Sequence, residues 1–521
     1  MESPVPVLDC ILLQFLIWLS KISKSLWLLK IFNKFTIGLG AQMKNKKNQQ
    51  FSHIFLITIF LVFGSTSFAD KTPQFDSLKN GVQKYIKGTN ISEKDWSLYI
   101  TTLEGDHAEV ILDINSKKKM IPASVTKILT AATTLEAFPP GYKFKTQLLK
   151  NADHKISDGV LKGSIYLKGG GDPSFVSENM WFLVNAFLRS GIKKIEGDLI
   201  VDDSLFDSIR FDGSRQENRV DRAYDAPVGA MSFNWNSVNI FVRPGTKGSP
   251  AQVFLDPNNS YLKLNNTTVT TSGSDQSIVA DRKNNLISVS GKLGTDAKEV
   301  VIFKSITEPD LWAGENLKSF FKQRSIEVTG DVKSGSAPTK SELLAESESK
   351  PIETVLADMN KFSNNYVAEM LTKNIASQNK TPGTLSQGIK AINEHMRKLD
   401  VPIDQYEIYN PSGLTRDNKM SSFALWKVLE HLKNDFRVYP EFLTSLPISG
   451  IDGTLKKRMK NSPAERWVRA KTGFLTGVVS LAGYAGRSDG RVFTFSFIYN
   501  GSLDEARIRN TFDQILIHLV K

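Results

Sequence analysis

The sequence predicts an α/β (α+β) fold, in which helices cover an antiparallel sheet and a mostly β insertion interrupts the domain. Three observations support this fold class. Residues 96–115 and 466–500 alternate apolar and polar side chains, residues 352 to about 435 have helical periodicity, and the region between about 150 and 335 holds many short β-type runs. Because strands stand at both ends with helices between them, the first and last segments are predicted to share one sheet.

The first strand pair is predicted from residues 96–115, "WSLYITTLEGDHAEVILDIN". Apolar and polar residues alternate on both sides of a Glu-Gly-Asp turn, which is the pattern of a β-hairpin. A helix that contains Ser124 is predicted directly after this hairpin.

After this helix, the residue pattern changes to many short β-type runs. Runs such as "GSIYLKGGGDPSF" and "VNIFVRPG", separated by Gly, Asn and Asp turns, predict an inserted β region over residues 151–334, with room for two subdomains. The stretch "SGSAPTKSELLAESESKP" that follows is predicted to be a polar linker. Helical periodicity returns with "IETVLADMNKFSNNYVAEMLTKNIA".

The last segment supplies the remaining strands. Residues 466–500 are predicted to form a hairpin that turns at "RSDGR", and "LDEARIRNTFDQILIHLV" is predicted to close the chain as an amphipathic helix. Residues 70–150 and 335–521 are therefore predicted to form one split domain around the insertion.

Residues 1–69 differ from the rest and are predicted to be a leader. The stretch "MKNKKNQQFSHIFLITIFLVFGSTSFAD" has a basic run, an apolar core of about ten residues and small residues ending at Ala69. This pattern predicts a secretory signal peptide over residues 43–69 and export across the inner membrane to the periplasm. The core is shorter than the roughly 20 residues that span a bilayer, so a retained anchor is the weaker alternative. Residues 1–42 are interpreted as an upstream extension, with Met43 as the true start.

Composition and charge limit the kinds of molecule that the protein is expected to bind. A content of 40% hydrophobic and 23% charged residues is typical of globular proteins. Of the formal net charge of +12, the seven lysines and two acids of the leader account for +5. Basic residues elsewhere are scattered and not interleaved with aromatic ones, so no nucleic-acid partner is expected, whereas attraction to an anionic polymer such as cell wall fits the charge. The single cysteine, Cys10, lies in the leader, and a mature chain without cysteine suits an oxidising compartment.

Ser124 and Lys127, in "PASVTKILT", are the candidate nucleophile and general base. On a helix, side chains three positions apart share one face, so the amine can accept the proton of the hydroxyl. The alternative is a helix cap followed by a surface lysine. The spacing alone is a poor signal, because it also occurs at Ser116, Ser190, Ser260, Ser319, Ser347 and Ser377. The apolar surroundings, "SVTKILTAATTLEA", predict a buried lysine. Lysine is rarely buried unless its amine is paired or has a catalytic role, so burial favours the functional interpretation.

Two further segments carry candidate site residues. In "KFSNNYVAEML", Ser363 is a candidate proton-relay alcohol and Asn365 a candidate partner of the lysine and the substrate, although serine and asparagine are also the preferred helix N-caps. In "RAKTGFLTGVVSLAGYAG", Lys471 and Thr472 are candidates for binding a terminal carboxylate. Gly473 lets a substrate backbone lie against the strand, and the alternative is a surface strand edge with a loop glycine.

Together the three segments, Ser-x-x-Lys, Ser-x-Asn and Lys-Thr-Gly, form the set found in β-lactamases and penicillin-binding proteins. With 239 residues between Ser124 and Ser363 and 108 between Ser363 and Lys471, the chain resembles the class C low-molecular-mass penicillin-binding proteins, the D-alanyl-D-alanine carboxypeptidase/endopeptidase family. The stretches "GGGDPSF", "YDAPVGAMSFNWNSV", "NPSGLTRDN" and "LPISGIDGTLKKRM" also resemble patterns of that family, so the resemblance covers residues 75–520.

The resemblance implies a penicillin-binding transpeptidase-like fold and assigns roles. Ser124 is the acylated nucleophile, Lys127 its general base, Ser363 and Asn365 the second motif, and Lys471, Thr472 and Gly473 the substrate strand. The oxyanion hole of such enzymes uses backbone N–H groups, here those of Ser124 and Phe474. The family commonly has Thr or Ser at the last position. Phe474 offers no hydroxyl there, so weaker binding of a substrate or penicillin carboxylate is expected.

The resulting hypothesis is a serine DD-peptidase that acts on peptidoglycan stem peptides, is acylated by β-lactam antibiotics and needs no metal or other cofactor. The sequence leaves two alternatives. A serine β-lactamase shares the three motifs, but no Glu-x-x-Leu-Asn run is present and the long insertion argues against it. The other is a catalytically idle wall-binding protein, which the intact motifs disfavour. At most peripheral membrane contact is expected; the oligomeric state, the role of the insertion and the balance between carboxypeptidase and endopeptidase activity stay open.

Overall fold

The computed structural model describes residues 72–104, 107–214, 223–379 and 382–521. The chain divides into a unit of residues 1–75 and a unit of residues 76–521. The predicted leader, residues 1–69, lies outside the described residues, so the signal peptide stays a prediction. Within the described ranges, no helix combines the length and the apolar character that crossing a bilayer requires.

The main sheet of the second unit is built from the two ends of the chain. Its five strands run antiparallel in the order β2-β1-β22-β21-β20. They are β1 (Trp96–Glu104), β2 (His107–Ile114), β20 (Val468–Leu475), β21 (Val478–Gly486) and β22 (Val492–Asn500). The predicted pairing of the first and last segments is confirmed, and β20 is left at the edge of the sheet.

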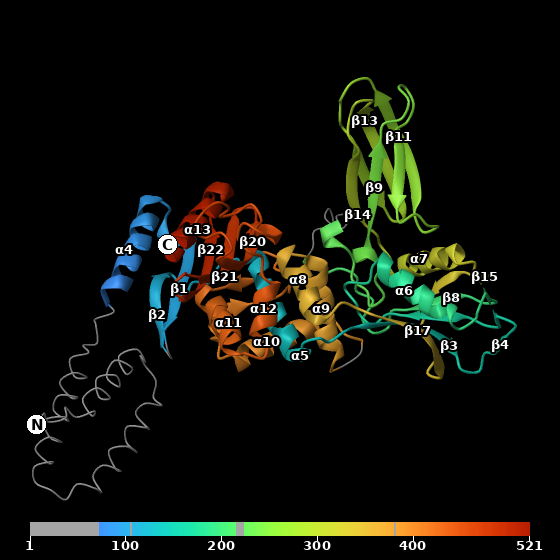
Figure 1. Ribbon diagram of the computed structural model, residues 1–521, viewed down its shortest axis with the longest axis horizontal. Coiled ribbons are helices and arrows are strands. Elements are labelled where there is room, and N and C mark those ends of the chain that lie inside the picture. The colour runs from blue at the N-terminus through green and yellow to red at the C-terminus, as the bar shows by residue number, and fades with distance from the viewer. Residues whose placement is uncertain (1–71, 105–106, 215–222, 380–381) are drawn as a thin grey trace, which may run out of the picture. The chain divides into compact units, whose positions relative to one another are not determined.

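Helices cover both faces of this sheet, as shown in Figure 1, where α11 (Ser422–Asn434) and α13 (Glu505–Val520) lie on opposite sides. Strand β21, "VVSLAGYAG", is buried along almost its whole length because it is covered from both sides. The other helices around the sheet are α4 (Thr72–Gly88), α5 (Lys127–Ala137), α8 (Ile352–Lys361), α9 (Asn365–Ser377), α10 (Leu385–Lys398) and α12 (Tyr439–Ser445). The predicted α/β (α+β) class is confirmed.

Short elements connect these helices and strands. The 3₁₀ turns are η1 (Glu93–Asp95), η2 (Ala123–Thr126), η4 (Ala223–Asp225), η5 (Asn234–Asn236), η6 (Ile403–Gln405) and η7 (Gly453–Leu455). Strands β18 (Tyr406–Glu407) and β19 (Lys419–Met420) form a small antiparallel pair.

Between α5 and α8, the described residues form four further sheets and two α-helices. A five-stranded sheet, in the order β16-β8-β6-β3-β17, consists of β3 (Lys145–Asn151), β6 (Ile165–Lys168), β8 (Leu199–Asp202), β16 (Val332–Ser334) and β17 (Ser341–Glu348). A second small sheet holds β4 (Ile156–Ser157), β5 (Val160–Leu161), β7 (Lys194–Ile195) and β15 (Glu327–Val328). The two helices are α6 (Ser177–Leu188) and α7 (Pro309–Gln323). The boundaries proposed for the split domain stay a prediction.

The prediction of a polar linker before α8 is wrong. Residues 341–348 of that stretch form strand β17, which pairs with β3 from Ser341 opposite Asn151 to Glu348 opposite Lys145. Its sequence "SELLAESE" has a charged, half-exposed face, and that face made the strand look like a linker. The pairing brings the two ends of the inserted region together.

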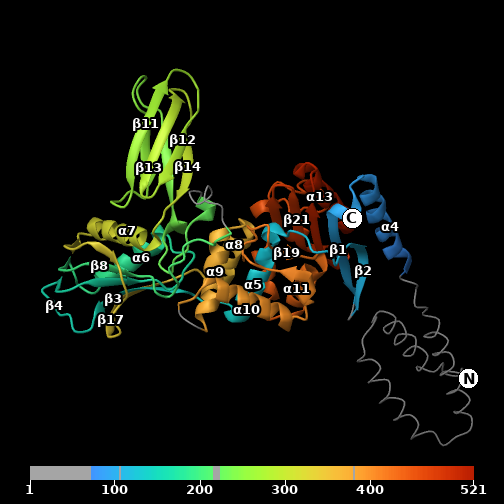
Figure 2. The same cartoon turned by 180° about the vertical axis from the view of Figure 1, so that it is seen from behind.

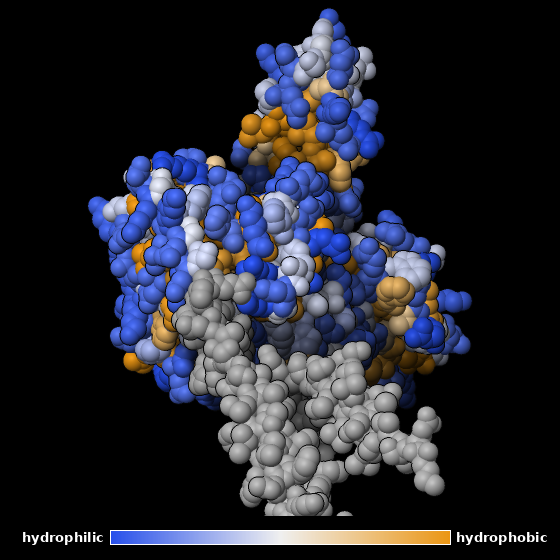
Figure 3. Space-filling model, turned by 60° about the vertical axis from the view of Figure 1, so that its left-hand side comes forward, coloured by the Kyte–Doolittle hydropathy of each residue, from blue (hydrophilic) through white to orange (hydrophobic). Residues whose placement is uncertain are grey.

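Two three-stranded sheets complete this region. One holds β9 (Ser237–Arg243), β10 (Gln252–Asp256) and β14 (Val300–Ser305), and the other β11 (Lys263–Thr271), β12 (Val279–Lys283) and β13 (Leu286–Gly294). They share a buried core. On the outer face of the first sheet, Phe254 and Val301 flank Phe241 in register, and an apolar area is visible on this lobe in Figure 3.

Candidate active site

Ser124 lies on the 3₁₀ turn η2, immediately before α5 begins at Lys127. The sequence predicted it inside the start of the helix. Side chains three positions apart are eclipsed in a 3₁₀ turn, so the spacing still brings the two groups together. The Lys127 Nζ atom donates to the Ser124 Oγ atom over 3.1 Å. Turn η2 contacts β20, and α5 packs against α8 and α9; Figure 2 displays these helices from behind.

Lys127 is completely buried. Besides Ser124, its Nζ atom donates to Asn365 Oδ1 and to the backbone oxygen of Ser412, both over 2.7 Å. Burial lowers the pKa of Lys127 to about 7, while the nearby carboxylates of Glu369 and Asp225 act in the opposite direction. The amine can therefore lose and regain a proton near neutral pH.

Ser363 and Asn365 lie at the junction of α8 and α9, as the sequence predicted. Asn365 is the first residue of α9 and turns its side chain inward to Lys127. Neither residue is the helix N-cap: that place is taken by Asn364, whose Oδ1 atom accepts from the Val367 N–H. Ser363 has a left-handed backbone with φ of 56°. A non-glycine residue in this region indicates a conformation that its surroundings impose.

Lys471 lies on β20 with its side chain completely buried. Its Nζ atom donates to Ser363 Oγ over 2.9 Å and to the Thr472 backbone oxygen over 2.7 Å. Burial, and secondarily the charge of Lys127, hold the pKa of Lys471 well below its usual value. Each lysine thus anchors its own polar group: Lys127 binds Ser124 and Asn365, and Lys471 binds Ser363.

Gly473 brings the edge strand close to the nucleophile. A Cβ atom at this position would lie 2.1 Å from Ser480 Oγ and 3.0 Å from the Ser124 backbone nitrogen. Only glycine allows this approach without displacing one of the two. The neighbouring side chains are exposed to a larger extent: the Thr472 hydroxyl donates to the Thr454 hydroxyl, and the half-exposed Phe474 ring lies 5.4 Å from the Arg509 guanidinium carbon.

No role was predicted for Ser412, whose backbone oxygen accepts a hydrogen bond from Lys127. It belongs to the stretch 410–418, in which Asn410 Oδ1 accepts from both the N–H and the hydroxyl of Ser412. A backbone acceptor has no side-chain signature. The nearby Gly413, with φ of 76° and no room for a Cβ beside the Ala123 oxygen, was the available signal of close packing against η2.

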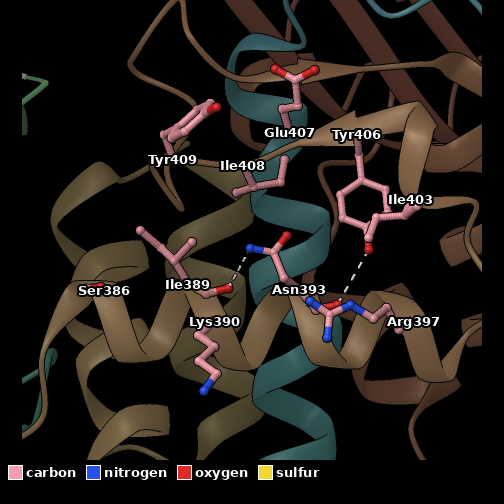
Figure 4. A pocket seen from close by; sticks show the side chains of 10 residues that line it. All are labelled: Ser386, Ile389, Lys390, Asn393, Arg397, Ile403, Tyr406, Glu407, Ile408 and Tyr409. Carbon is pink, nitrogen blue, oxygen red and sulfur yellow. Dashed lines mark hydrogen bonds between the residues drawn. The ribbon is translucent and has the colours of Figure 1, made fainter.

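A separate hollow of about 400 Å³ borders the segment that leads into Asn410 (Figure 4). Side chains of α10, among them Asn393 and Arg397, form one wall, and Tyr406 and Tyr409 lie across from them. None of the predicted site residues lines it. The candidate site lies instead where η2, the α8–α9 junction and β20 meet.

Residues 78–519 match the D-Ala-D-Ala carboxypeptidase 3 (S13) family. The chain belongs to this family. The D-alanyl-D-alanine carboxypeptidase of Actinomadura sp. (strain R39) is 31% identical over 401 residues, which are 74% of this chain and 74% of that protein. The D-alanyl-D-alanine carboxypeptidase DacB of Haemophilus influenzae is 29% identical over 414 residues, which are 75% of this chain and 83% of that protein.

The fold has a solved counterpart within the same group of proteins. The crystal structure of penicillin binding protein 4 from Haemophilus influenzae has a TM-score of 0.72 at 24% identity and covers 84% of this chain and 99% of that one. The family predicted from the three motifs is confirmed, and with it the enzyme class, a serine-type D-Ala-D-Ala carboxypeptidase.

Proposed function

We propose that this S13 enzyme cleaves peptidoglycan stem peptides next to a D-alanine through an acyl-enzyme on Ser124. The observation that carries the proposal is the pairing of the Ser124 hydroxyl with a fully buried lysine, 3.1 Å away, whose pKa is lowered to about 7. A base with a pKa near the working pH combines a useful unprotonated fraction with enough basicity to take the proton.

The first half of the reaction forms the ester. Unprotonated Lys127 takes the proton of Ser124 as the Oγ atom attacks the carbonyl carbon between the two D-alanines. The negative oxygen of the tetrahedral intermediate is stabilised by the backbone N–H groups of Ser124 and Phe474. The closeness of Gly473 to the Ser124 nitrogen supports this assignment, because Phe474 is the next residue of the same strand.

The leaving amine must receive a proton when the peptide bond breaks. Lys471 donates to the Ser363 oxygen, which leaves the Ser363 O–H free to donate to that amine. The proton held by Lys127 then returns to Ser363 through an intervening water. Water then attacks the ester with Lys127 again as base, and Ser124 is regenerated.

The substrate is proposed to bind as an added strand along the open edge of β20. Main-chain hydrogen bonds fix its register, and Lys471 and Thr472 attract the terminal carboxylate. Phe474 contributes its N–H but no hydroxyl to this end of the strand. The penicillin-sensitive carboxypeptidase A of Dictyostelium discoideum and the complex of the Haemophilus influenzae protein with a β-lactam support inhibition by penicillins.

The compartment is proposed from the leader. A signal peptide over residues 43–69 would export the enzyme to the periplasm, where its substrate lies. Amino-terminal sequencing of the mature protein recovered from that compartment tests this, and a chain that begins before residue 43 contradicts it.

Labelling with a fluorescent penicillin, followed by denaturing electrophoresis, tests the function. A lasting adduct is expected with the unmodified enzyme and none with Ser124→Ala, while Ser116→Ala, at the same Ser-x-x-Lys spacing, serves as the matched control. Rapid turnover of the antibiotic would indicate a β-lactamase, and no adduct at all would indicate an idle wall-binding protein. Either result overturns the proposal.

Digestion of cross-linked and uncross-linked muropeptides side by side then separates the two DD-peptidase activities. Release of D-alanine from uncross-linked chains measures the carboxypeptidase, and conversion of dimers to monomers measures the endopeptidase. The proposal requires at least one of them to depend on Ser124.

A further inference from the structure

The inserted region contributes a buried carboxylate to the catalytic centre. Asp225 closes the turn η4 and is completely buried. The Asn365 Nδ2 atom donates to the Asp225 Oδ1 atom over 3.3 Å. Asn365 is also the residue whose other terminal atom, Oδ1, accepts from Lys127 over 2.7 Å. The Asn365 amide therefore bridges Asp225 and Lys127, the proposed base.

The chemistry of the two ends of an amide makes this contact directional. An ionised carboxylate only accepts hydrogen bonds, so it selects the NH₂ end of Asn365. The carbonyl end must then face Lys127. With the amide turned over, its NH₂ group would meet the donating lysine, and a carbonyl would meet the carboxylate, so that two favourable contacts would become two repulsive ones.

The turn that carries Asp225 is firmly attached to the catalytic core. Ala226, Val228 and Ala230, which follow it, are buried in the same apolar cluster as the side chains of α5 and α9. Along α9, Lys373 forms an ion pair with Asp207, and Asn374 donates to the Gly171 oxygen, both in the inserted region. The insertion thus holds Asp225 at a fixed distance from the start of α9.

We propose that Asp225 is a positioning residue for catalysis: it locks the Asn365 amide in the orientation that presents an acceptor to Lys127, and so makes the inserted region part of the catalytic machinery. This rests on the proposed role of Lys127 as the base.

The charges around Lys127 add a second effect. The charged groups that act on its pKa are Glu369 on α9 and Asp225 on η4. Lys471 on β20 faces it as well, and the charge of Lys127 lowers the pKa of Lys471. The Asp225 carboxylate raises the pKa of Lys127 against the lowering effect of burial. Removing this charge therefore lowers the pKa further, and a larger fraction of the amine is unprotonated at a given acidic pH.

Asp225→Asn tests the inference because it removes the charge and the preference for one amide end with almost no change in volume. The second-order rate constant of acylation by a fluorescent penicillin is expected to fall by about 10- to 100-fold at its plateau. The acid limb of the rate against pH is expected to move to lower pH. A loss of packing alone would not move this limb. Asp172→Asn is the matched control, since Asp172 is buried in the same region but accepts from Ser174.

A double-variant cycle shows whether Asp225 acts through Asn365. The variant Asp225→Asn/Asn365→Ala is expected to be acylated no more slowly than Asn365→Ala alone, because the amide to be oriented is gone. Thermal unfolding of each variant identifies loss of the fold, and Asp225→Ser, which keeps an acceptor without the charge, replaces any variant that unfolds.

The outcomes separate the inference from the proposed function. If the unmodified enzyme is not acylated, the proposed function fails. If the unmodified enzyme and the Asp172→Asn control are acylated normally, and Asp225→Asn matches them in rate and in pH profile, the role of Asp225 alone is refuted. Fully additive losses in the double variant would also refute it.

Discussion

The candidate active site has a helical wall, formed by η2, α5 and α9, and a strand wall, formed by β20. Each wall buries a lysine, but the two lysines have different surroundings. On the helical wall, Lys127 has the carboxylates of Glu369 and Asp225 nearby, and its pKa falls to about 7. On the strand wall, Lys471 forms no ion pair among the described residues, and its pKa is held well below the usual value. Burial lowers both pKa values, and the carboxylates decide how far. We therefore expect the helical wall to transfer the proton and the strand wall to supply hydrogen bonds.

Substitution of Lys127 is expected to have the largest effect on the rate of acylation. Lys127→Gln is expected to lower the acylation rate by about 10²- to 10⁴-fold, the usual contribution of a general base. In the unmodified enzyme the rate should rise as the pH increases through about 7, because only the unprotonated amine accepts the Ser124 proton. Stopped-flow acylation over a pH series measures both effects.

A control for this prediction is Lys433→Gln. Burial also lowers the pKa of Lys433, but this residue lies on α11 outside the site. Its substitution should leave the rate and the pH dependence unchanged. A profile without an acid limb near neutrality in the unmodified enzyme would contradict the role of Lys127.

Lys471→Ala should have the next largest effect. Loss of this donor is expected to lower acylation by about 10²-fold, because Ser363 and the carboxylate of the ligand lose a common partner. The acid limb should remain near neutral pH, since Lys127 and its two carboxylates are still present. If the limb disappears instead, the two lysines do not have the distinct roles that their surroundings indicate.

Gly473→Ala tests how closely the two walls approach. The added methyl group would overlap Ser480 Oγ and press on the Ser124 nitrogen, so acylation should fall by roughly tenfold or more. Gly213→Ala is the control, because a Cβ at Gly213 meets nothing within 4 Å. An unchanged rate for Gly473→Ala would mean that β20 does not lie against the nucleophile during the reaction.

Phe474→Thr should have the smallest effect and the opposite sign. A hydroxyl at this position offers an additional hydrogen bond to a ligand carboxylate, which should raise acylation by less than about tenfold. Comparison of penicillin with an analogue whose carboxylate is esterified isolates the contribution, because only the free acid should benefit. A loss of rate with both ligands would show that the aromatic ring itself supports binding.

The three motifs picked out side chains that come together because their spacing carries the chemistry. Lys127 binds Ser124 and Asn365 in one hydrogen-bonded group, and Lys471 binds Ser363 in a second. The hairpin over residues 96–115 and the closing helix are also where the alternation and the helical periodicity put them.

What the sequence could not predict depends on contacts between distant segments. The Ser412 carbonyl is a backbone group, so no residue type marks it. In the sequence, nothing distinguishes Asp225 from a surface aspartate. Its contact with Asn365 depends on the packing of η4 against α9. Strand β17 was mistaken for a linker because its partner β3 lies almost 200 positions earlier, as in the pair Leu343 and Leu149. Tertiary packing decided each of these cases.

The order of strands in the main sheet bears on when the enzyme becomes active. Strand β1 can pair with β2 early, but its other neighbour, β22, and the strand that carries Lys471 come from the final part of the chain. A chain that is still being synthesised therefore holds Ser124 without the strand that carries Lys471. A hydrolase built in this way acquires a complete active site only when its synthesis is essentially finished.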